Sequence, residues 1–323
     1  QHIKLSAHSK NPLVIFKNIK KIKNIILNNN INLVHIRSRA PAWSVYYASK
    51  DLCKTSSTFH NVYNHQNLIK RYYNKRLSKV NNIVAISEYV KKSITNIYKI
   101  DVNKITVIHR GIDINFFNPE IKNDELAYLK FIKQYHVPND KQIILYPGRL
   151  TQWKGQIEFL KILELLESKD FICYFVGDDK NKSYRVKLEK EINIKNLSSN
   201  CKVIGHIDMK NLYFMYKSAD IVVSAPLQPE GFCRVISEGL AMEKIVLCYN
   251  FGGAKEQILG LDNFYAVEPF NKNQMINKIK KALNLSMNQK KQMGEMARMH
   301  ILKNFTKQIM LEKYLNFYHK IIL

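Results

Sequence analysis

Two glutamates, Glu230 and Glu238, whose carboxylates can bind hydroxyl groups, lie in the stretch 229–241, which follows the apolar run 221–226. The run predicts a buried parallel strand. A proline and a glycine then predict a turn into a helix, with Glu238 about two turns along it. Open α/β sheets bind ligands at this kind of strand end, where helix amides favour phosphate and carboxylates favour hydroxyls. The stretch predicts a pocket for a sugar diphosphonucleotide, with an ordinary βα turn carrying two exposed glutamates as the alternative.

A second group of residues supplies positive charge. Arg149 follows a predicted strand at 142–146, and Lys154 begins a predicted helix at 154–166. A guanidinium fork with an ammonium group suits a diphosphate, and the pair would stabilise negative charge developing on a diphosphate leaving group. The position predicts that both side chains face a crevice between two domains. Two ordinary surface cations at a sheet edge are the alternative.

A histidine, His60, ends the predicted short strand 56–60. It is expected to face the same crevice from the other side, where it could hydrogen-bond a substrate hydroxyl or a developing charge. A structural histidine is the alternative. No His, Cys and Asp cluster has metal-ligand spacing, and the chain has neither a Gly-x-Gly-x-x-Gly nor a Walker motif.

The composition indicates a folded protein of two domains. The chain has 323 residues, 46% of them hydrophobic, and contains no run of 18 apolar residues that would span a membrane. Its five cysteines are scattered without paired spacing, which predicts reduced core residues of a cytosolic protein.

Glycine is distributed unevenly. The first glycine is Gly111, ten of the 11 lie from Gly148 onward, and the chain begins with Gln1 and has its first methionine at Met209. A nucleotide-binding first domain without glycine would be unusual. We therefore expect the first domain to be N-terminally incomplete, lacking its first strand and a glycine-bearing loop.

Charge is also uneven. Residues 1–112 carry 20 basic and three acidic residues, a net of +17, whereas the remainder carries 31 and 23, a net of +8. Such a field attracts polyanions or an anionic membrane surface. A coding sequence rich in A and T would explain many lysines but not the scarcity of acids, so we favour an anionic partner for the first domain.

Apolar runs alternate with amphipathic stretches along the whole chain, which predicts an α/β fold with two Rossmann-like parallel sheets in series. A polar segment at 112–140 with a short helix is expected to connect them. The predicted division is a first domain at 1–136, a second at 137–305 and a final helix at 306–323. Strands are expected at 31–37, 56–60, 83–87, 105–109, 142–146, 171–176, 201–207, 221–225, 245–249 and 265–267.

Taken together, these residues resemble the retaining family 4 glycosyltransferases of GT-B fold, also called group 1 glycosyl transferases. The resemblance covers most of the chain. Within the family, the sequence looks closest to a bacterial cell-envelope, lipopolysaccharide subgroup. Its signature is Glu230 and Glu238 with seven residues between them. The other motifs that carry it are Ser9-Lys10-Asn11-Pro12, 37–43, Thr58-Phe59-His60, 108–113, 147–156 and Gly252-Gly253-Ala254-Lys255-Glu256.

The resemblance implies a role for each matching residue. Arg149 and Lys154, with Gly148 beside them, would hold the donor diphosphate. Glu238 would bind the ribose. Glu230 would contact the donor sugar, with the amides of Gly231 and Phe232 near the sugar or the phosphate.

On the other side of the cleft, the resemblance implies that His60 reaches the donor sugar. Arg37 and Arg39 would lie on the acceptor or membrane side, and the final helix would return to the first domain. Such enzymes generally need no metal or cofactor, the nucleotide-diphosphate sugar being a co-substrate. Asn61 and Cys233 depart from the family, which tends to have glycine at both places.

The sequence thus predicts a metal-independent, retaining glycosyltransferase that is cytoplasmic and peripheral on the inner membrane. It would move a sugar from a UDP- or GDP-sugar to a lipid-linked or lipopolysaccharide-type glycan. A sugar-nucleotide epimerase or a phosphorylase on the same fold, and an inactive fragment, are alternatives. A basic nucleic-acid-binding protein is a further one, although neither a recognition helix nor an aromatic stacking platform is evident, and no nucleic-acid partner is expected.

Overall fold

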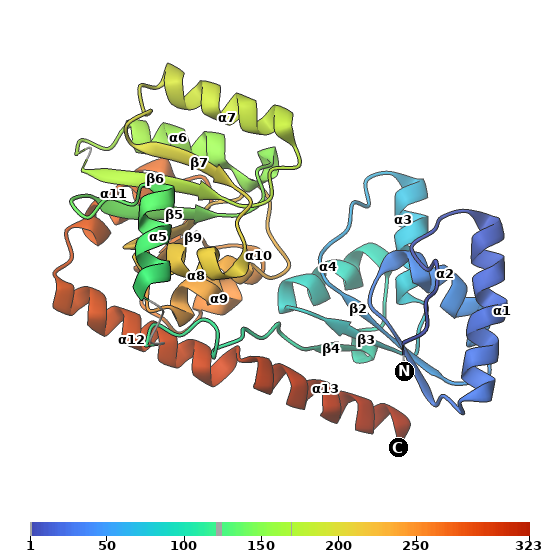
Figure 1. Cartoon of the computed structure of the whole chain (residues 1–323). Coiled ribbons are helices and arrows are strands. Elements are labelled where there is room, and N and C mark those ends of the chain that lie inside the picture. Colours follow the sequence, from blue (N-terminus) through green and yellow to red (C-terminus); the bar gives the residue numbers. More distant parts are fainter. Residues whose placement is uncertain (1, 121–124, 169) are drawn as a thin grey trace. The chain divides into compact units, whose positions relative to one another are not determined.

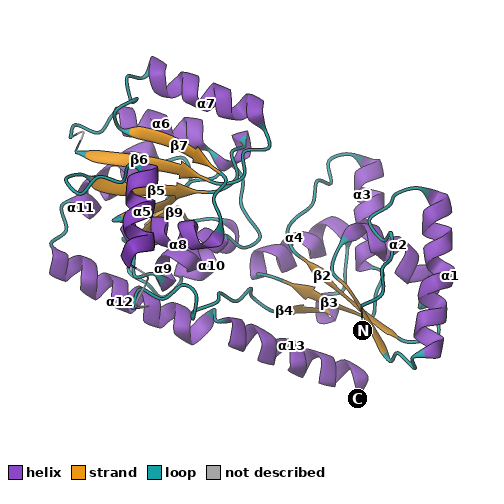
Figure 2. Ribbon diagram, in the orientation of Figure 1, coloured by secondary structure: helices purple, strands orange, loops and turns teal. Residues whose placement is uncertain are grey.

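The computed structural model describes residues 2–120, 125–168 and 170–323 (Figure 1) and divides into two compact units. Unit 1 comprises Gln1–Arg110 with Gln308–Leu323, and unit 2 comprises Gly111–Lys307. Each unit is an α/β body built on one parallel sheet, as the orange strands of Figure 2 show. The predicted fold class, with two Rossmann-like parallel sheets, is confirmed.

Unit 1 contains a four-stranded parallel sheet in the order β1-β2-β3-β4. Helices lie before and between the strands because parallel neighbours need a crossover connection. The strands are β1 (Leu33–Ile36), β2 (Lys54–Phe59), β3 (Asn82–Ala85) and β4 (Ile105–Val107). The helices are α1 (Pro12–Asn28), α2 (Arg39–Ala48), α3 (Leu68–Lys75) and α4 (Glu88–Tyr98), with short 3-10 turns at Arg76–Ser78 and Val102–Lys104.

Unit 2 contains a six-stranded parallel sheet in the order β10-β9-β8-β5-β6-β7. Its strands are β5 (Gln142–Pro147), β6 (Phe171–Val176), β7 (Cys201–Gly205), β8 (Ile221–Ser224), β9 (Ile245–Tyr249) and β10 (Ala266–Val267). Its helices are α5 (Glu125–Tyr135), α6 (Gln156–Glu164), α7 (Lys182–Ile194), α8 (Met209–Ser218), α9 (Arg234–Ala241), α10 (Gly252–Ile258), α11 (Lys272–Leu283) and α12 (Met287–Asn304).

The core of unit 2 lies on both faces of this sheet. Strands β6, β8 and β9 are buried at every position, and β5 at all but its first, which explains their continuous apolar sequences. From β5 the sheet grows in one direction through β6 and β7, and in the other through β8, β9 and β10. The strand order therefore reverses between β5 and β8, as in dinucleotide-binding folds.

The contact division differs from the expected boundary after residue 136. Residues 111–120 and 125–135 group with unit 2, and α5 packs on α8 through Phe131 and Phe214, whose ring centroids are 5.4 Å apart. The Tyr128 hydroxyl also lies 3.0 Å from Ser218 Oγ. A polar, proline-containing stretch looked like a linker in the sequence, yet its apolar helix face belongs to the second sheet.

The last helix, α13 (Lys307–Ile322), joins unit 1 from residue 308 onward. Its Phe317 is buried against Val84 and Ile108. A polar contact adds to this packing: His35 Nδ1 lies 3.0 Å from the Tyr318 hydroxyl and 2.8 Å from Ser56 Oγ. A histidine of β1 therefore ties α13 to the sheet of unit 1.

This histidine should make unit 1 less stable in acid. Burial, followed by the charge of Arg37, lowers the pKa of His35 to about 4, so the unfolded chain binds its proton first as pH falls below 6.5. We expect the free energy of unfolding to fall between pH 7 and pH 5 more steeply in the wild-type protein than in His35→Gln. The two slopes should differ by at most about 1.4 kcal/mol per pH unit. Urea unfolding at both pH values measures this difference. Equal slopes would contradict the role of His35.

Candidate functional site

The predicted residues of unit 2 gather at the switch point of its sheet. Strands β5 and β8 are parallel neighbours, so the segments 148–155 and 225–233 leave the same, carboxyl edge. At such a reversal the two connections diverge to opposite faces and leave a crevice between them. Arg149, Lys154 and Glu230 lie in these two segments, and Glu238 lies in the helix that follows.

The two segments are fastened to each other through backbone groups. Tyr146, fully buried at the end of β5, donates its hydroxyl to Lys154 O at 2.6 Å and accepts from Ala225 N at 3.2 Å. Leu227 N donates to Trp153 O at 2.7 Å. A Cβ on Gly155 would lie 2.4 Å from Ala225 O, so only glycine permits this close approach.

Lys154 and Glu230 form an ion pair across the switch point. Lys154 Nζ lies 2.6 Å from Glu230 Oε1, and each side chain is only 12% exposed. Lys154 Nζ also lies 4.7 Å from the Trp153 ring centroid, and Arg149 Cζ lies 5.7 Å from the same centroid. The ion pair is therefore largely shielded from water, which strengthens its charge interaction, whereas Arg149 beside it is exposed.

Glu238 is held by two groups that the sequence analysis did not single out. Tyr216 donates its hydroxyl to Glu238 Oε2 at 2.8 Å, and Arg234 Nη2 lies 2.9 Å from Glu238 Oε1. Burial raises the pKa of the Glu238 carboxyl, while the Arg234 charge and the Tyr216 hydrogen bond oppose the rise. Helix α9 begins at Arg234, so Glu238 lies about one turn into the helix and not two.

The burial of both carboxylates contradicts the alternative of two exposed glutamates. Glu238 has an 8% exposed side chain, against 12% for Glu230. Acidic side chains are almost never buried this far unless they are paired, which both are here. The structure thus brings Arg149, Lys154, Glu230 and Glu238 to one edge of the sheet.

Gly231 and Phe232 are positioned by the pair Gly252-Gly253 at the start of α10. Gly253 N donates to Glu230 O at 2.8 Å, and a Cβ on Gly253 would lie 2.1 Å from Gly231 O. Phe232 is 8% exposed, its ring centroid 6.0 Å from that of Phe305. The turn that carries Glu230 is therefore fixed by α10 as well as by the segment after β5.

Unit 1 carries the remaining predicted residues, after the carboxyl ends of β1 and β2. His60 Nδ1 lies 3.2 Å from Arg110 Nη2. Burial first, then the charges of Arg110 and Arg37, lower the pKa of His60 to about 4, so its imidazole is neutral near pH 7. Arg39 lies 4.3 Å from the Tyr63 ring centroid and donates to Asn74 Oδ1 at 3.1 Å. His60 can act there as a hydrogen-bonding group but not as a cation.

Within residues 2–120, 125–168 and 170–323, no three His, Cys, Asp or Glu side chains converge as a metal site would require. Independence of metal stays a prediction. None of the helices in this described part combines the length and apolar character needed to cross a bilayer.

Two family matches cover nearly the whole chain. Residues 129–300, more than half of the protein, match the family described as "Glycosyl transferases group 1", and residues 2–116 match "Glycosyltransferase Family 4". The chain belongs to the group 1 glycosyl transferases. It is therefore an enzyme, a glycosyltransferase of GT-B fold, and the family predicted from its motifs is confirmed at this level.

Individual relatives agree with this family. A crystal structure of a glycosyltransferase from Rickettsia africae ESF-5 is 38% identical with a TM-score of 0.89, covering 99% of this chain and 85% of its own. The lipopolysaccharide 1,2-N-acetylglucosaminetransferase of Salmonella typhimurium is 27% identical over 47% of this chain and 42% of its own length. Anabaena Alr3699/HepE in complex with UDP-glucose shares the fold, with 18% identity and a TM-score of 0.82, over 96% and 84% of the two chains.

Several residues that build this candidate site were missed by sequence reasoning. Tyr146 and Tyr216 stand within apolar segments, where they resemble core residues, and Arg234 resembles one of many surface cations. A spacing signal was available for Arg234, since positions i and i+4 of a helix face one another. Nothing local in the sequence could show that Tyr216 of α8 reaches Glu238 of α9.

The close approach at Gly155 makes a prediction about stability. Gly155→Ala should lower the free energy of unfolding by about 1–3 kcal/mol, because alanine would take a left-handed φ of +79° and collide with Ala225 O. Chemical denaturation followed by circular dichroism measures the loss. Gly260→Ala is the matched control, since Gly260 has a φ of +93° but an added Cβ meets nothing nearer than 4.0 Å. If both variants lose the same stability, the contact between the two segments is unimportant.

Proposed function

We propose that this enzyme transfers a hexose or similar sugar from a UDP- or GDP-sugar to a lipid-linked or lipopolysaccharide-type glycan, with retention of configuration and without a metal. The observation that carries the proposal is the pairing of Lys154 with Glu230 at the switch point, next to Arg149 and the buried Glu238. This arrangement offers cations for a diphosphate and carboxylates for hydroxyl groups at one edge of the sheet.

The cations bind and then stabilise the leaving diphosphate. Arg149 offers a fork of donors, and Lys154 exchanges its Glu230 partner for a phosphate oxygen when the donor enters. Negative charge grows on the diphosphate as the glycosidic bond breaks, so a fixed ammonium group lowers the barrier. The segment after β5 is held by Gln156, whose Nε2 donates to Arg149 O at 2.9 Å.

The carboxylates bind the two sugar rings of the donor. Glu238, oriented by Tyr216 and Arg234, keeps lone pairs free to accept hydrogen bonds from the ribose hydroxyls. Glu230, once released by Lys154, accepts from hydroxyls of the transferred sugar, with the Gly231 and Phe232 amides nearby. Because hydroxyls must be held by acceptors in a dehydrated pocket, a donor lacking them leaves buried carboxylates unsatisfied.

The acceptor hydroxyl attacks on the face from which the diphosphate departs. Residues 1–112 hold only three acidic side chains, and none of them follows β1 or β2 beside Arg37 and His60. We therefore propose no covalent glycosyl-enzyme intermediate. Neutral His60 contacts the sugar through a hydrogen bond and does not act as a cation.

The acceptor and its location are inferred from charge. Residues 1–112 have a net charge of +17, and Arg37 and Arg39 follow β1. The outer face of α1 adds exposed Leu13 and Phe16 beside exposed lysines, a composition that suits a membrane interface. Together with the resemblance to the Salmonella lipopolysaccharide enzyme, this supports an anionic or lipid-linked acceptor at the cytoplasmic face of the inner membrane.

The donor assignment predicts which ligands stabilise the protein. A UDP- or GDP-sugar that binds the native state should raise the melting temperature, and the panel member with the largest shift identifies the donor. Lys154→Ala should weaken nucleotide binding by roughly 10- to 100-fold, since hydrogen bonds to charged groups contribute about 1.5–3 kcal/mol. Glu238→Ala should lose affinity for the nucleotide but not for inorganic diphosphate. Lys161→Ala, an exposed lysine of α6, is the matched control, and the site is wrong if Lys154→Ala binds as that control does.

The stereochemical outcome gives an independent test. Proton NMR during the first turnovers should show the product with the same anomeric configuration as the donor sugar. Inversion would contradict the proposed same-face attack. Donor consumption without an added acceptor would favour an epimerase, and dependence on inorganic phosphate would favour a phosphorylase.

A further inference from the structure

A hollow of about 580 Å³ lies at the amino edge of the unit 1 sheet. Its lining includes Lys54 and Thr55 at the start of β2, Asn81 just before β3, and Lys104 just before β4. Because these strands are parallel, this is the edge opposite to the one that carries Arg37 and His60. The six residues of β2 separate the two edges by about 20 Å.

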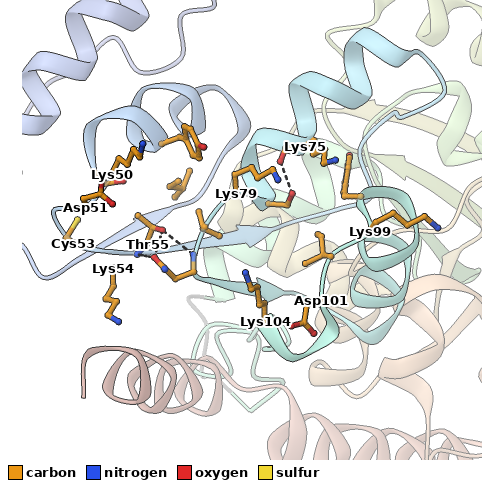
Figure 3. A pocket seen from close by; sticks show the side chains of 18 residues that line it. Lys50, Asp51, Cys53, Lys54, Thr55, Lys75, Lys79, Lys99, Asp101 and Lys104 are labelled. Atoms are coloured by element: carbon orange, nitrogen blue, oxygen red, sulfur yellow. Dashed lines mark hydrogen bonds between the residues drawn. The ribbon is translucent and has the colours of Figure 1, made fainter.

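Six lysines line this hollow, against two acidic residues, Asp51 and Asp101. In Figure 3 the side chains of Lys79 and Lys104 extend toward the middle of the group that is drawn, whereas Lys54 points away from it. The Asp101 carboxylate is engaged locally, accepting from Asn103 N at 3.0 Å. The lysines are Lys50, Lys54, Lys75, Lys79, Lys99 and Lys104.

In the part of the chain that the structure describes, none of these six lysines takes part in an ion pair. Lysines of unit 2 behave differently: Lys195 pairs with Glu164 at 2.7 Å and Lys290 with Asp220 at 2.9 Å. Six like charges around one concavity repel each other, and a bound anion removes that repulsion. The hollow therefore carries a net positive charge and has room for a small ligand.

We propose that this hollow is a second anion site, separate from the sugar-transfer site, that binds a compact ligand carrying two or more phosphate groups. Neutral donors complete the lining: Ser49, Thr55 and Asn81 lie among the lysines. Clustered phosphates match several ammonium groups at once, which a single carboxylate does not. The phosphates are those of a lipid headgroup or of a soluble phosphorylated metabolite.

The test replaces two lysines of the hollow with glutamate. As a matched control, two lysines outside the hollow are replaced in the same way. Lys79→Glu/Lys104→Glu changes the hollow, and Lys17→Glu/Lys21→Glu makes the same change in charge on exposed positions of α1. Both pairs are made in an Arg149→Ala/Lys154→Ala background, so that the cations of unit 2 do not bind the probe. Tripolyphosphate binding is measured by calorimetry, and thermal unfolding checks that each variant is folded.

We expect tripolyphosphate affinity to fall by about tenfold or more in the Lys79/Lys104 variant, and to change by about twofold or less in the control. A charge-removing pair, Lys79→Gln/Lys104→Gln, should give an intermediate loss. Equal losses in the hollow and control variants would overturn the proposal, because the attraction would then come from the overall charge. Absence of tripolyphosphate binding would overturn it as well.

A second arm identifies the source of the phosphates. Sedimentation with cardiolipin vesicles, whose headgroup carries two phosphates, against phosphatidylcholine vesicles, supports a lipid headgroup if it depends on Lys79 and Lys104. Tripolyphosphate binding without vesicle binding supports a soluble ligand. Preference for a single-stranded oligonucleotide over tripolyphosphate would overturn the assignment. UDP binding by the protein with Arg149 and Lys154 intact is measured separately, so failure here and failure of the donor site are distinguishable.

Discussion

The proposed sugar-transfer site depends on the close approach of two backbone segments at the point where the strand order of unit 2 reverses. The segments after β5 and β8 diverge to opposite faces of the sheet, yet Gly155 and Ala225 must touch for Lys154 to reach Glu230. Tyr146 stabilises this contact, because its hydroxyl forms hydrogen bonds with backbone groups of both segments. The positions of the charged side chains follow from this contact, because each sits within a few residues of it.

The Lys154–Glu230 pair also explains how a strongly charged pocket is tolerated before a ligand arrives. An isolated ammonium or carboxylate group at 12% exposure would be costly, whereas the pair satisfies both groups. In the proposed reaction, a diphosphate replaces Glu230 as the partner of Lys154 without leaving this cation unpaired. The freed Glu230 then needs hydrogen-bond donors, which sugar hydroxyls supply. The proposal therefore couples the two events: the phosphate and the sugar of one donor molecule would each satisfy one half of the broken pair.

Much of this arrangement could be predicted from the sequence because it is local. Continuous apolar runs such as 171–176 specify buried parallel strands, and residues just after a strand must lie at its carboxyl edge, which placed Arg149 and Glu230 correctly. The rest depends on contacts between distant segments. Tyr216 reaches Glu238 across 22 residues, and the helix 125–135 joins unit 2 through aromatic contacts that no linker-like composition reveals. The start of α9 at Arg234 was also missed, because a turn with a proline and a glycine does not specify its last residue.

Charge is distributed between the units in a way that composition alone does not account for. If lysine were simply abundant in the whole chain, both units would contain lysines, and these would form ion pairs with nearby acidic residues. Lysines of unit 2 do form such pairs. Residues 1–112 have three acids for 20 basic side chains, so these acids cannot neutralise most of the basic side chains whatever the fold. Such a surface stays soluble but repels itself, and this repulsion weakens whenever an anion binds. Binding of anions to unit 1 should therefore stabilise its fold, which makes anionic surroundings part of the conditions under which this half of the enzyme is most stable.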